Sequence, residues 1–377
     1  MKILLLCWRD TAHPQAGGSE RYLEHVGGYL AQLGHEVYLR TAASRGHPAT
    51  QTIDGVVHHR YGGKFTVYPR AFLAMLAGRM GLGPYRHTDV VVDTQNGIPF
   101  FAVWAMGQPT IVLTHHCHRE QWPVAGRVLA AVGWFIESVL SPRVNRHCDY
   151  VTVSGPSAEE LVALGVDARR IHIIRNGVDP IPEGLPVTRK DGACRPVHLV
   201  CLSRLVPHKQ IEHAMDVVAA LSATRPVVLD VIGSGWWEEN LHAYARQLGV
   251  ADNVVFHGQV SEEDKHALLA AADLHVMPSR KEGWGLAVIE AACHGLPTVG
   301  YRCSAGLNDS VVDGVTGVLV DSKAELIAEI SRLIDDPAAV DALGGKAKAR
   351  AAGYSWVDTG RRFAQLIDTV AAPASRR

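Results

Sequence analysis

The chain has 377 residues, of which 47% are hydrophobic and 20% charged, and its formal net charge is -1. This length and apolar content suit two domains, each with its own core. Proteins that bind nucleic acid usually have a strongly basic surface, so the near-neutral net charge gives no indication of nucleic-acid binding. The seven cysteines show no C-x-x-C spacing, so we expect reduced thiols in a cytoplasmic protein.

No membrane-spanning segment is expected. The apolar run 3–8 is too short for a signal peptide and ends at Arg9-Asp10, so it is predicted to be a buried first strand. The longest apolar helical stretch, 124–140, is interrupted by Gly126-Arg127 and by Glu137. It is shorter than the roughly 18 apolar residues that a span requires.

Short β-branched or leucine-rich runs alternate with helical patterns along the whole chain, which is typical of βαβ units and parallel sheets. In the first half the predicted strands are 3–7, 36–40, 90–93, 110–113, 150–153 and 171–174, with helices near 19–33, 97–106, 124–141 and 156–164. In the second half the predicted strands are 197–202, 227–232, 254–256, 274–277, 298–300 and 318–320.

The segment 176–192 is rich in proline and glycine and lacks periodicity, which indicates an interdomain linker. The sequence therefore predicts an α/β protein with two Rossmann-like, doubly wound parallel-sheet domains facing a cleft. Residues 1–180 are predicted to form the N-terminal domain and residues 181–355 the C-terminal domain. A C-terminal helix and tail are predicted at 356–377, and the helix could pack against the N-terminal domain.

The first strand-to-helix junction, residues 9–21, carries Gly17 and Gly18 just before a predicted helix. Two glycines there allow the backbone to approach a phosphate and to offer free N–H groups. The junction lacks the G-x-G-x-x-G spacing of a dinucleotide fingerprint. A flexible loop capped by Ser19 is the alternative.

The loop after the fourth predicted strand, residues 114–122, contains His115, His116 and His118. Their spacing lacks a carboxylate or thiol at an interval recognised for zinc, so no metal site is predicted. A polar loop at the end of a strand suits hydrogen bonding to a sugar. Solvated surface histidines are the alternative.

Arg204 and Lys209 flank a proline-containing turn after the first strand of the second half. Both cations can converge on one anion, which arginine can bind through two parallel hydrogen bonds. Fixed cations would stabilise a departing nucleoside diphosphate. Two glycine loops, one with Gly233 and one with Gly258, are expected to border the same nucleotide. Exposed, solvated basic residues are the alternative.

Glu282 and Glu290 stand eight residues apart, the first in a glycine-rich turn and the second on the helix that begins near Leu286. Backbone N–H groups at Gly285 and Leu286 could face a phosphate at that helix N-terminus. A carboxylate one turn into the helix can accept two hydroxyls of a sugar diol. The pattern indicates a nucleotide-sugar site, with a surface turn carrying two unrelated glutamates as the alternative.

Taken in order, these loops resemble the retaining glycosyltransferases of family 4, which have the GT-B fold. The residues that carry the resemblance, over about 1–370, are 17–20, the His116 loop, 176–179, Ser203-Arg204 with Lys209, Gly233 and Gly235, 257–258, Glu282 with Glu290, and 313–317. Two departures are Ser203, where many relatives have glycine, and 305–310 in place of a glycine-proline-glutamate run, so Asp309 receives no role.

The resemblance implies that Arg204 and Lys209 hold the diphosphate, that Glu290 binds the ribose hydroxyls, and that Glu282 contacts the transferred sugar. Gly17 and Gly18 would pass close to the diphosphate, and His116 would reach the sugar from the other domain. His116 is chosen over His115 and His118 by alignment of the loop. No metal and no cofactor is implied, because the cations and the helix N-terminus replace them.

The implied activity is transfer of a hexose from a GDP- or UDP-sugar to a hydroxyl of a glycan, lipid or small molecule, with retention of configuration. The amphipathic stretch 66–80, with Arg143 and Arg146, suits either peripheral contact with the inner face of a membrane or packing as an ordinary core helix. Two other activities stay open on this scaffold: a nucleotide-sugar epimerase or phosphorylase, and a non-catalytic nucleotide-sugar-binding protein.

Overall fold

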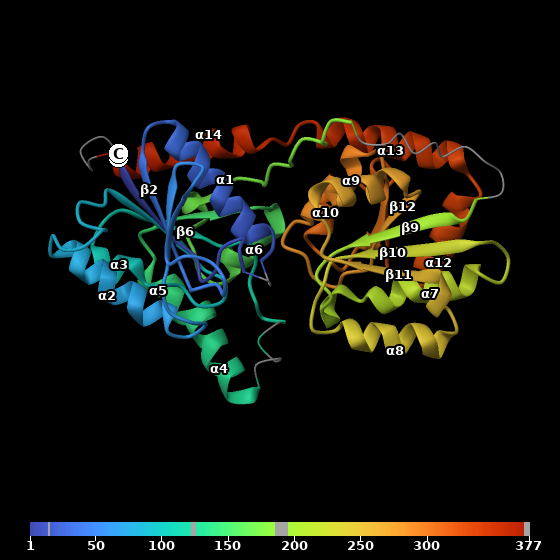
Figure 1. Ribbon diagram of the computed structural model, residues 1–377, viewed down its shortest axis with the longest axis horizontal. Helices are drawn as coiled ribbons and strands as arrows, with labels where there is room; N and C mark the ends of the chain where they lie inside the picture. The colour runs from blue at the N-terminus through green and yellow to red at the C-terminus, as the bar shows by residue number, and fades with distance from the viewer. Residues whose placement is uncertain (14–15, 121, 123–125, 185–194, 373–377) are drawn as a thin grey trace. The chain divides into compact units, whose positions relative to one another are not determined.

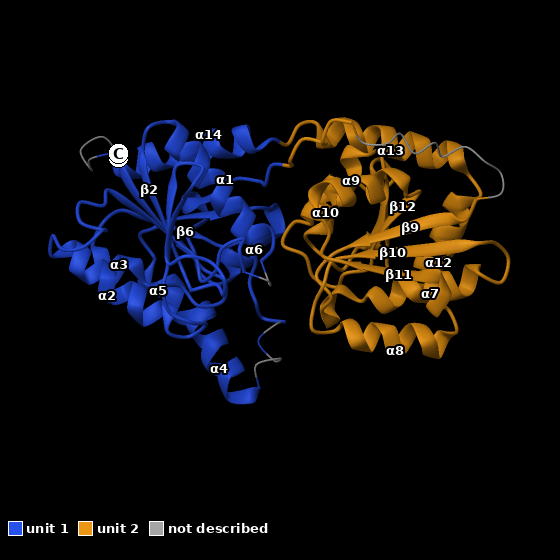
Figure 2. Cartoon of the chain, in the orientation of Figure 1, with its two compact units in different colours: residues 1–177, 355–377 blue, residues 178–354 orange. Residues whose placement is uncertain are grey.

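The computed structural model describes residues 1–13, 16–120, 122, 126–184 and 195–372. Residues 185–192 of the predicted linker and Cys194 lie outside the described residues, as do parts of the glycine-rich and histidine loops (14–15 and 121). The chain divides into two compact units, which Figure 2 colours separately: Met1–Gly177 with Ser355–Arg377, and Val178–Tyr354.

Unit 1 is built on an eight-stranded sheet in the order β3-β4-β2-β1-β5-β6-β7-β8. All neighbouring strands are parallel except β3 and β4. Both faces of the central strands are buried, which explains why β5 is a continuous apolar run ending in Asp93-Thr94. The strands are β1 (Lys2–Leu6), β2 (Glu36–Thr41), β3 (Thr50–Ile53), β4 (Val56–Arg60), β5 (Val90–Thr94), β6 (Thr110–Leu113), β7 (Asp149–Thr152) and β8 (Ile171–Ile173).

Helices lie beside this sheet (Figure 1). They are α1 (Gly18–Gln32), α2 (Val67–Arg79), α3 (Ala102–Met106), α4 (Arg127–Phe135), the π-helix η2 (Ile136–Leu140), α5 (Ser141–Val144), α6 (Gly155–Ala163), the 3-10 turn η3 (Ala168–Arg170) and α14 (Trp356–Ala371). The apolar side of α2, with Val67, Ala71 and Met75, packs into the core of unit 1. The amphipathic stretch is thus a core helix with an exposed edge.

Two predictions for this unit were wrong. The hairpin β3–β4 was missed, although Asp54-Gly55 is a typical two-residue hairpin turn in which both residues have positive φ. The polar, exposed β3 offers no apolar alternation that would predict a strand. The predicted helix at 97–106 is helical only over α3, because Gly97 and Phe101 adopt left-handed conformations that a helix does not allow.

Unit 2 has a six-stranded parallel sheet in the order β11-β10-β9-β12-β13-β14. Its strands are β9 (Val197–Leu202), β10 (Val227–Ile232), β11 (Val254–Gly258), β12 (Leu274–Met277), β13 (Thr298–Tyr301) and β14 (Gly317–Val320). Its helices are η4 (Pro207–Lys209), α7 (Ile211–Leu221), α8 (Glu238–Leu248), η5 (Ala251–Asn253), α9 (Glu262–Ala271), α10 (Leu286–Cys293), α11 (Leu307–Ser310), α12 (Lys323–Ile334) and α13 (Pro337–Ala351). Both units therefore confirm the predicted α/β class with parallel sheets.

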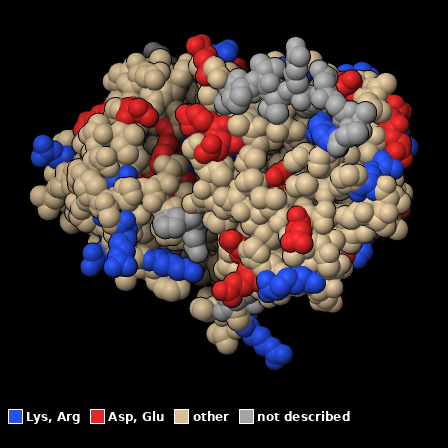
Figure 3. Space-filling view, turned by 45° about the vertical axis from the view of Figure 1, so that its right-hand side comes forward, with Lys and Arg blue, Asp and Glu red and all other residues tan. Residues whose placement is uncertain are grey.

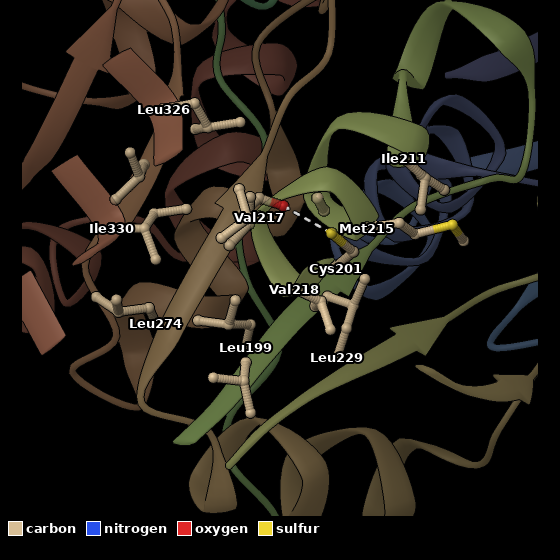
Figure 4. Packing of buried hydrophobic residues seen from close by; sticks show 14 of the residues in the cluster. Leu199, Cys201, Ile211, Met215, Val217, Val218, Leu229, Leu274, Leu326 and Ile330 are labelled. Atoms are coloured by element: carbon tan, nitrogen blue, oxygen red, sulfur yellow. Dashed lines mark hydrogen bonds between the residues drawn. The ribbon is translucent and has the colours of Figure 1, made fainter. Parts of the chain in front are cut away.

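The core of unit 2 fills the space between the sheet and helices α7 and α12. Figure 4 shows Leu199 and Leu229 from the sheet with Val217 and Val218 from α7 and Ile330 from α12. The thiol of Cys201 donates to the carbonyl of Val276 at 3.1 Å, which links β9 to β12. Burial raises the pKa of the Cys201 thiol to about 12, so this cysteine stays protonated and structural.

Charged side chains of both signs occur on the face drawn in Figure 3, and neither sign covers it. This mixture agrees with the net charge of -1. Among the described residues, the structure contains no helix that is both long and apolar enough to cross a membrane.

The C-terminal helix α14 packs on α1 within unit 1. Its apolar face, including Phe363 and Ile367, is fully buried, and the hydroxyl of Thr359 donates to the carbonyl of Arg175 at 2.8 Å. A Cβ at Gly360 would lie 2.3 Å from Cγ of Tyr29 on α1. The close approach of the two helices therefore requires glycine at this position.

We predict that Gly360→Ala lowers the free energy of unfolding by about 1–3 kcal/mol, because the methyl group overpacks the contact with Tyr29. Gly345→Ala in α13 is the matched control, since a Cβ there meets nothing within 4 Å, and it should be neutral or stabilising. Urea unfolding followed by circular dichroism measures both. Equal stability of Gly360→Ala and the wild type would contradict the packing described.

Candidate functional site

In unit 2, the loop after β9 carries the two predicted phosphate-binding cations. Arg204 is exposed, and Lys209 ends the turn η4. The next residue, Gln210, adopts a left-handed conformation with φ 50° and leads into α7. The backbone N–H of Arg280, after β12, donates to the carbonyl of His208 at 2.9 Å. The ends of the adjacent strands β9 and β12 are thereby tied together, as expected where parallel sheets bind ligands.

The glycine loops at Gly233 and Gly258 support this loop through their backbone. A Cβ at Gly233, which has φ 123°, would lie 2.0 Å from the carbonyl oxygen of Ser203. A Cβ at Gly235 would lie 2.1 Å from the carbonyl oxygen of Leu205. The N–H of Gly233 donates to the carbonyl of Gly258 at 2.8 Å. Gly233 and Gly235 therefore allow their backbone to pack directly against the loop after β9.

Lys209 and Glu282 form an ion pair in which Nζ lies 2.5 Å from Oε1, and both side chains are largely buried. Burial alone would raise the pKa of the Glu282 carboxyl, but the charge and hydrogen bond of Lys209 outweigh it and hold that pKa below its usual value. The structure thus places a predicted phosphate ligand directly beside the predicted sugar-binding carboxylate, and Glu282 is ionised at neutral pH.

Glu290 lies on α10, whose N-cap is Gly285 in a left-handed conformation with φ 93°. Leu286 is the first residue of the helix, so the predicted helix start is confirmed. Glu290 has its own cation, because its Oε1 accepts a hydrogen bond from Nζ of Lys265 on α9 at 2.7 Å. The two glutamates are therefore held by two different lysines on two different elements.

In unit 1, the glycine loop is organised by Glu20. Its buried carboxylate accepts from the N–H of Gly17 at 2.8 Å and from the hydroxyl of Ser19 at 2.9 Å. It also pairs with Arg9, whose Nε lies 2.6 Å away. Gly17, not Ser19, is the N-cap residue of α1, and Gly18 begins the helix. The helix cap predicted at Ser19 in the alternative interpretation was therefore wrong.

The three histidines of the next loop have different surroundings. His115 is buried, and this burial lowers its pKa to about 4, so it stays neutral. Nδ1 of His118 lies 3.0 Å from Oε1 of the buried Glu137, which also accepts from Nε1 of Trp122 at 2.7 Å. His116 is half-buried, and its ring centroid lies 4.5 Å from that of His118.

Within the described residues, one group of side chains could hold a metal ion: Asp10, Glu24 and His58, whose ligand atoms all lie within 4.8 Å of one another. It includes none of the predicted site residues. Asp10 already pairs with Nε of Arg60 at 2.5 Å, and Glu24 accepts from the N–H and hydroxyl of Thr11. A fixed guanidinium in the group repels a cation, so these residues fit an internal ion pair better than a metal site.

Sequence analysis assigned no role to three residues that organise the site: Glu20, which is part of the segment 17–20 that carries the resemblance, Lys265 and Arg280. A signal existed for Glu20, which stands three residues after Gly17, the spacing of a capping box. Arg280 carries no local signal, because its backbone partner His208 is on another element. The spacing of Glu262 and Lys265 on one helix predicts only a surface pair, and the contact of Lys265 with Glu290 is to another helix.

The chain is similar in sequence to known glycosyltransferases. Residues 16–181 match the family model described as Glycosyltransferase Family 4, and residues 195–350 match Glycosyl transferases group 1. The chain is 32% identical to the GDP-mannose-dependent alpha-(1-6)-phosphatidylinositol monomannoside mannosyltransferase of Mycolicibacterium smegmatis, over 69% of this chain and 70% of that protein. It is 27% identical to the MMP alpha-(1->4)-mannosyltransferase of Mycolicibacterium hassiacum, over 94% and 95%.

Solved structures show the same fold. Sucrose-phosphate synthase from Thermosynechococcus elongatus has a TM-score of 0.81 at 20% identity, with 98% of each chain covered. An Anabaena protein solved in complex with UDP and glucose has a TM-score of 0.73 at 19% identity, covering 98% of this chain and 100% of that one.

The fold and these relatives define a nucleotide-sugar glycosyltransferase with the GT-B fold. The chain belongs to glycosyltransferase family 4, which confirms the family predicted from its loops.

The ion pair at the site makes a prediction about pH. A depressed carboxyl pKa in the folded state adds stability above the unfolded pKa, and this stability is lost as pH falls through the folded pKa. In Lys209→Met the buried Glu282 lacks the ammonium group of Lys209, so its pKa in the folded state should rise above the value in the unfolded state. The free-energy cost of burying the charged carboxylate then disappears as falling pH protonates it. We expect a loss of about 3 kcal/mol at pH 7 that shrinks towards pH 4.

Urea unfolding at both pH values measures this loss. The control is Lys209→Met combined with Glu282→Gln, in which no buried charge remains and the difference from the wild type should be nearly independent of pH in this range. A loss in Lys209→Met that is equal at both pH values would show that Glu282 is not the group responsible.

Proposed function

We propose that this chain is a retaining, metal-independent hexosyltransferase that moves a hexose from a nucleoside-diphosphate sugar to a hydroxyl of a glycan or lipid. The observation that carries the proposal is the ion pair between Lys209 and Glu282, 2.5 Å long, at the ends of adjacent strands. It puts a cation for the diphosphate and a carboxylate for the sugar hydroxyls side by side. The bond to be broken joins those two parts of the donor.

In the proposed step, the bond between the anomeric carbon and the diphosphate oxygen breaks, and its electron pair leaves with the diphosphate. Arg204 and Lys209 stabilise this growing charge more than they stabilise the ground state. The acceptor oxygen bonds to the same face of the anomeric carbon, and its proton passes to the departing phosphate. Because the acceptor attacks the face from which the diphosphate departs, configuration is retained without an enzymic nucleophile.

The base and sugar of the donor are tested first with GDP-mannose, because the name of the 32% identical relative specifies it, and then with UDP-glucose. A ligand that binds only the folded state raises the melting temperature by mass action. Transfer is then assayed with glycan and lipid acceptors. Release of an epimerised nucleotide sugar without acceptor, or binding of a donor without transfer to any acceptor, would contradict the proposal.

We also propose peripheral contact with a membrane. Phe65, Leu73 and Met80 are strongly exposed in and beside α2, and Arg70 and Arg79 are exposed on the same helix. Apolar side chains beside cations favour anionic lipid surfaces. Co-sedimentation with vesicles containing phosphatidylglycerol should be weaker for Leu73→Glu than for the wild type, and equal sedimentation would exclude this contact.

The two glutamates should have separable roles. Glu290→Gln should weaken binding of donor and of free nucleoside diphosphate alike, by about 1.5–3 kcal/mol for the lost charged hydrogen bond. Glu282→Gln should lower kcat with the full donor, yet leave affinity for the diphosphate unchanged or higher, because Lys209 no longer has to leave a carboxylate partner. Calorimetry with the diphosphate and steady-state kinetics with the donor separate the two. Equal loss of diphosphate affinity in both variants would indicate one shared nucleotide clamp.

Activity should survive chelation, because the proposed mechanism uses Arg204, Lys209 and backbone N–H groups where other enzymes use a divalent ion. Turnover measured after dialysis against EDTA should equal that of the untreated enzyme. Loss of activity that Mn²⁺ or Mg²⁺ restores would show that a metal ion takes part.

A further inference from the structure

Lys265 on α9 is a lysine with almost no access to water. Only 7% of the residue's surface is exposed. Its Nζ donates hydrogen bonds to Oε2 of Glu262 and to Oε1 of Glu290, both at 2.7 Å. A lysine is almost never this buried unless it is paired. Burial alone would lower the pKa of its ammonium group, but the charges of Glu290 and Glu262 outweigh burial and hold that pKa above its usual value.

The two partners of Lys265 are not equivalent. Glu262 is three residues earlier on the same helix, and its side chain is 43% exposed, so this contact is an ordinary helix-surface pair worth little. Glu290 lies on another helix, and its side chain is 15% exposed. Buried leucine and alanine side chains from both helices, including Leu269 and Ala291, pack in one cluster. Lys265 is thus fixed between α9 and α10, with its ammonium group on Glu290.

This contact controls what Glu290 can do. A carboxylate that binds a ribose diol accepts two hydroxyl hydrogens, so it must be ionised and held in one orientation. Among the described residues, Lys265 occupies Oε1 of Glu290, and no hydrogen bond to Oε2 is present there. A lone carboxylate in this position would also repel the diphosphate of the donor, and the adjacent ammonium group offsets that repulsion.

We propose that Lys265 is a positioning residue for nucleotide recognition: its ammonium group holds the Glu290 side chain in one orientation, so that this carboxylate accepts the ribose 2′- and 3′-hydroxyls. The inference rests on the proposed function, and it adds a residue that touches neither the reacting atoms nor the nucleotide. Its signature is specific, because the effect of changing Lys265 must depend on those two hydroxyls being present in the ligand.

The test compares GDP and UDP with their 2′,3′-dideoxy counterparts by isothermal titration calorimetry, using the full chain. Lys265→Met keeps the length and apolar stem of the side chain but removes the charge. We expect it to weaken binding of the ribose diphosphate about 10-fold, a change of roughly 1.4 kcal/mol, and binding of the dideoxy ligand by less than about 2-fold. The wild type should itself prefer the ribose ligand.

Two further variants separate positioning from general damage. Lys265→Arg restores a cation beside Glu290 and should recover most of the lost affinity. Glu262→Gln removes only the exposed partner and should bind the ribose ligand as the wild type does. Circular dichroism and thermal unfolding verify that each variant is folded. Lys265→Gln replaces Lys265→Met in the same comparison if the methionine variant does not fold.

The outcomes distinguish the two proposals. If the wild type binds neither GDP nor UDP, the proposed function fails, and the role of Lys265 fails with it. If the wild type binds one of them but Lys265→Met, or its glutamine replacement, loses affinity equally for the ribose and dideoxy ligands, only the positioning role is overturned. Unchanged affinity in that variant overturns the positioning role as well.

Discussion

The ion pair between Lys209 and Glu282 is the interaction on which the candidate site in unit 2 depends. Each side chain needs the other, because a buried charge without a partner costs several kcal/mol. Together they fix the loop after β9 relative to the turn after β12, and the backbone bond from Arg280 to His208 supports the same junction. The ends of two neighbouring strands are therefore held together by an ion pair and a backbone hydrogen bond.

The same pair sets a condition on ligand binding. A diphosphate that binds Lys209 competes with Glu282 for the ammonium group. Its interactions must therefore be more favourable than the ion pair that they replace. Arg204, exposed on the same loop, can supply part of that difference through two parallel hydrogen bonds. If the sugar hydroxyls then bind Glu282, its negative charge is again satisfied. In the proposed function, recognition of the phosphate and of the sugar would thus be linked through Glu282.

Much of the fold followed from the sequence, because a strand buried on both faces leaves a continuous apolar run, as in β5. The hairpin β3–β4 was missed since β3 is polar and exposed, and only its Asp54-Gly55 turn marks it. The predicted site residues at Lys209 and Glu282 were placed in loops after strands, but their mutual contact spans 73 positions. No local pattern encodes a contact of that kind.

The role of Lys265 was even harder to predict from the sequence, because there it is one charged residue among several on a polar helix. Only the packing of α9 beside α10 turns it into a buried cation. Lys209 contacts one glutamate and Lys265 the other, so Glu282 and Glu290, eight residues apart, belong to two separate ion pairs. Each carboxylate contacts its own lysine, and each lysine comes from a different element. Glu282 lies in a turn and Glu290 on the helix that follows, and each belongs to a separate ion pair. The proposed function can therefore assign the two glutamates different roles.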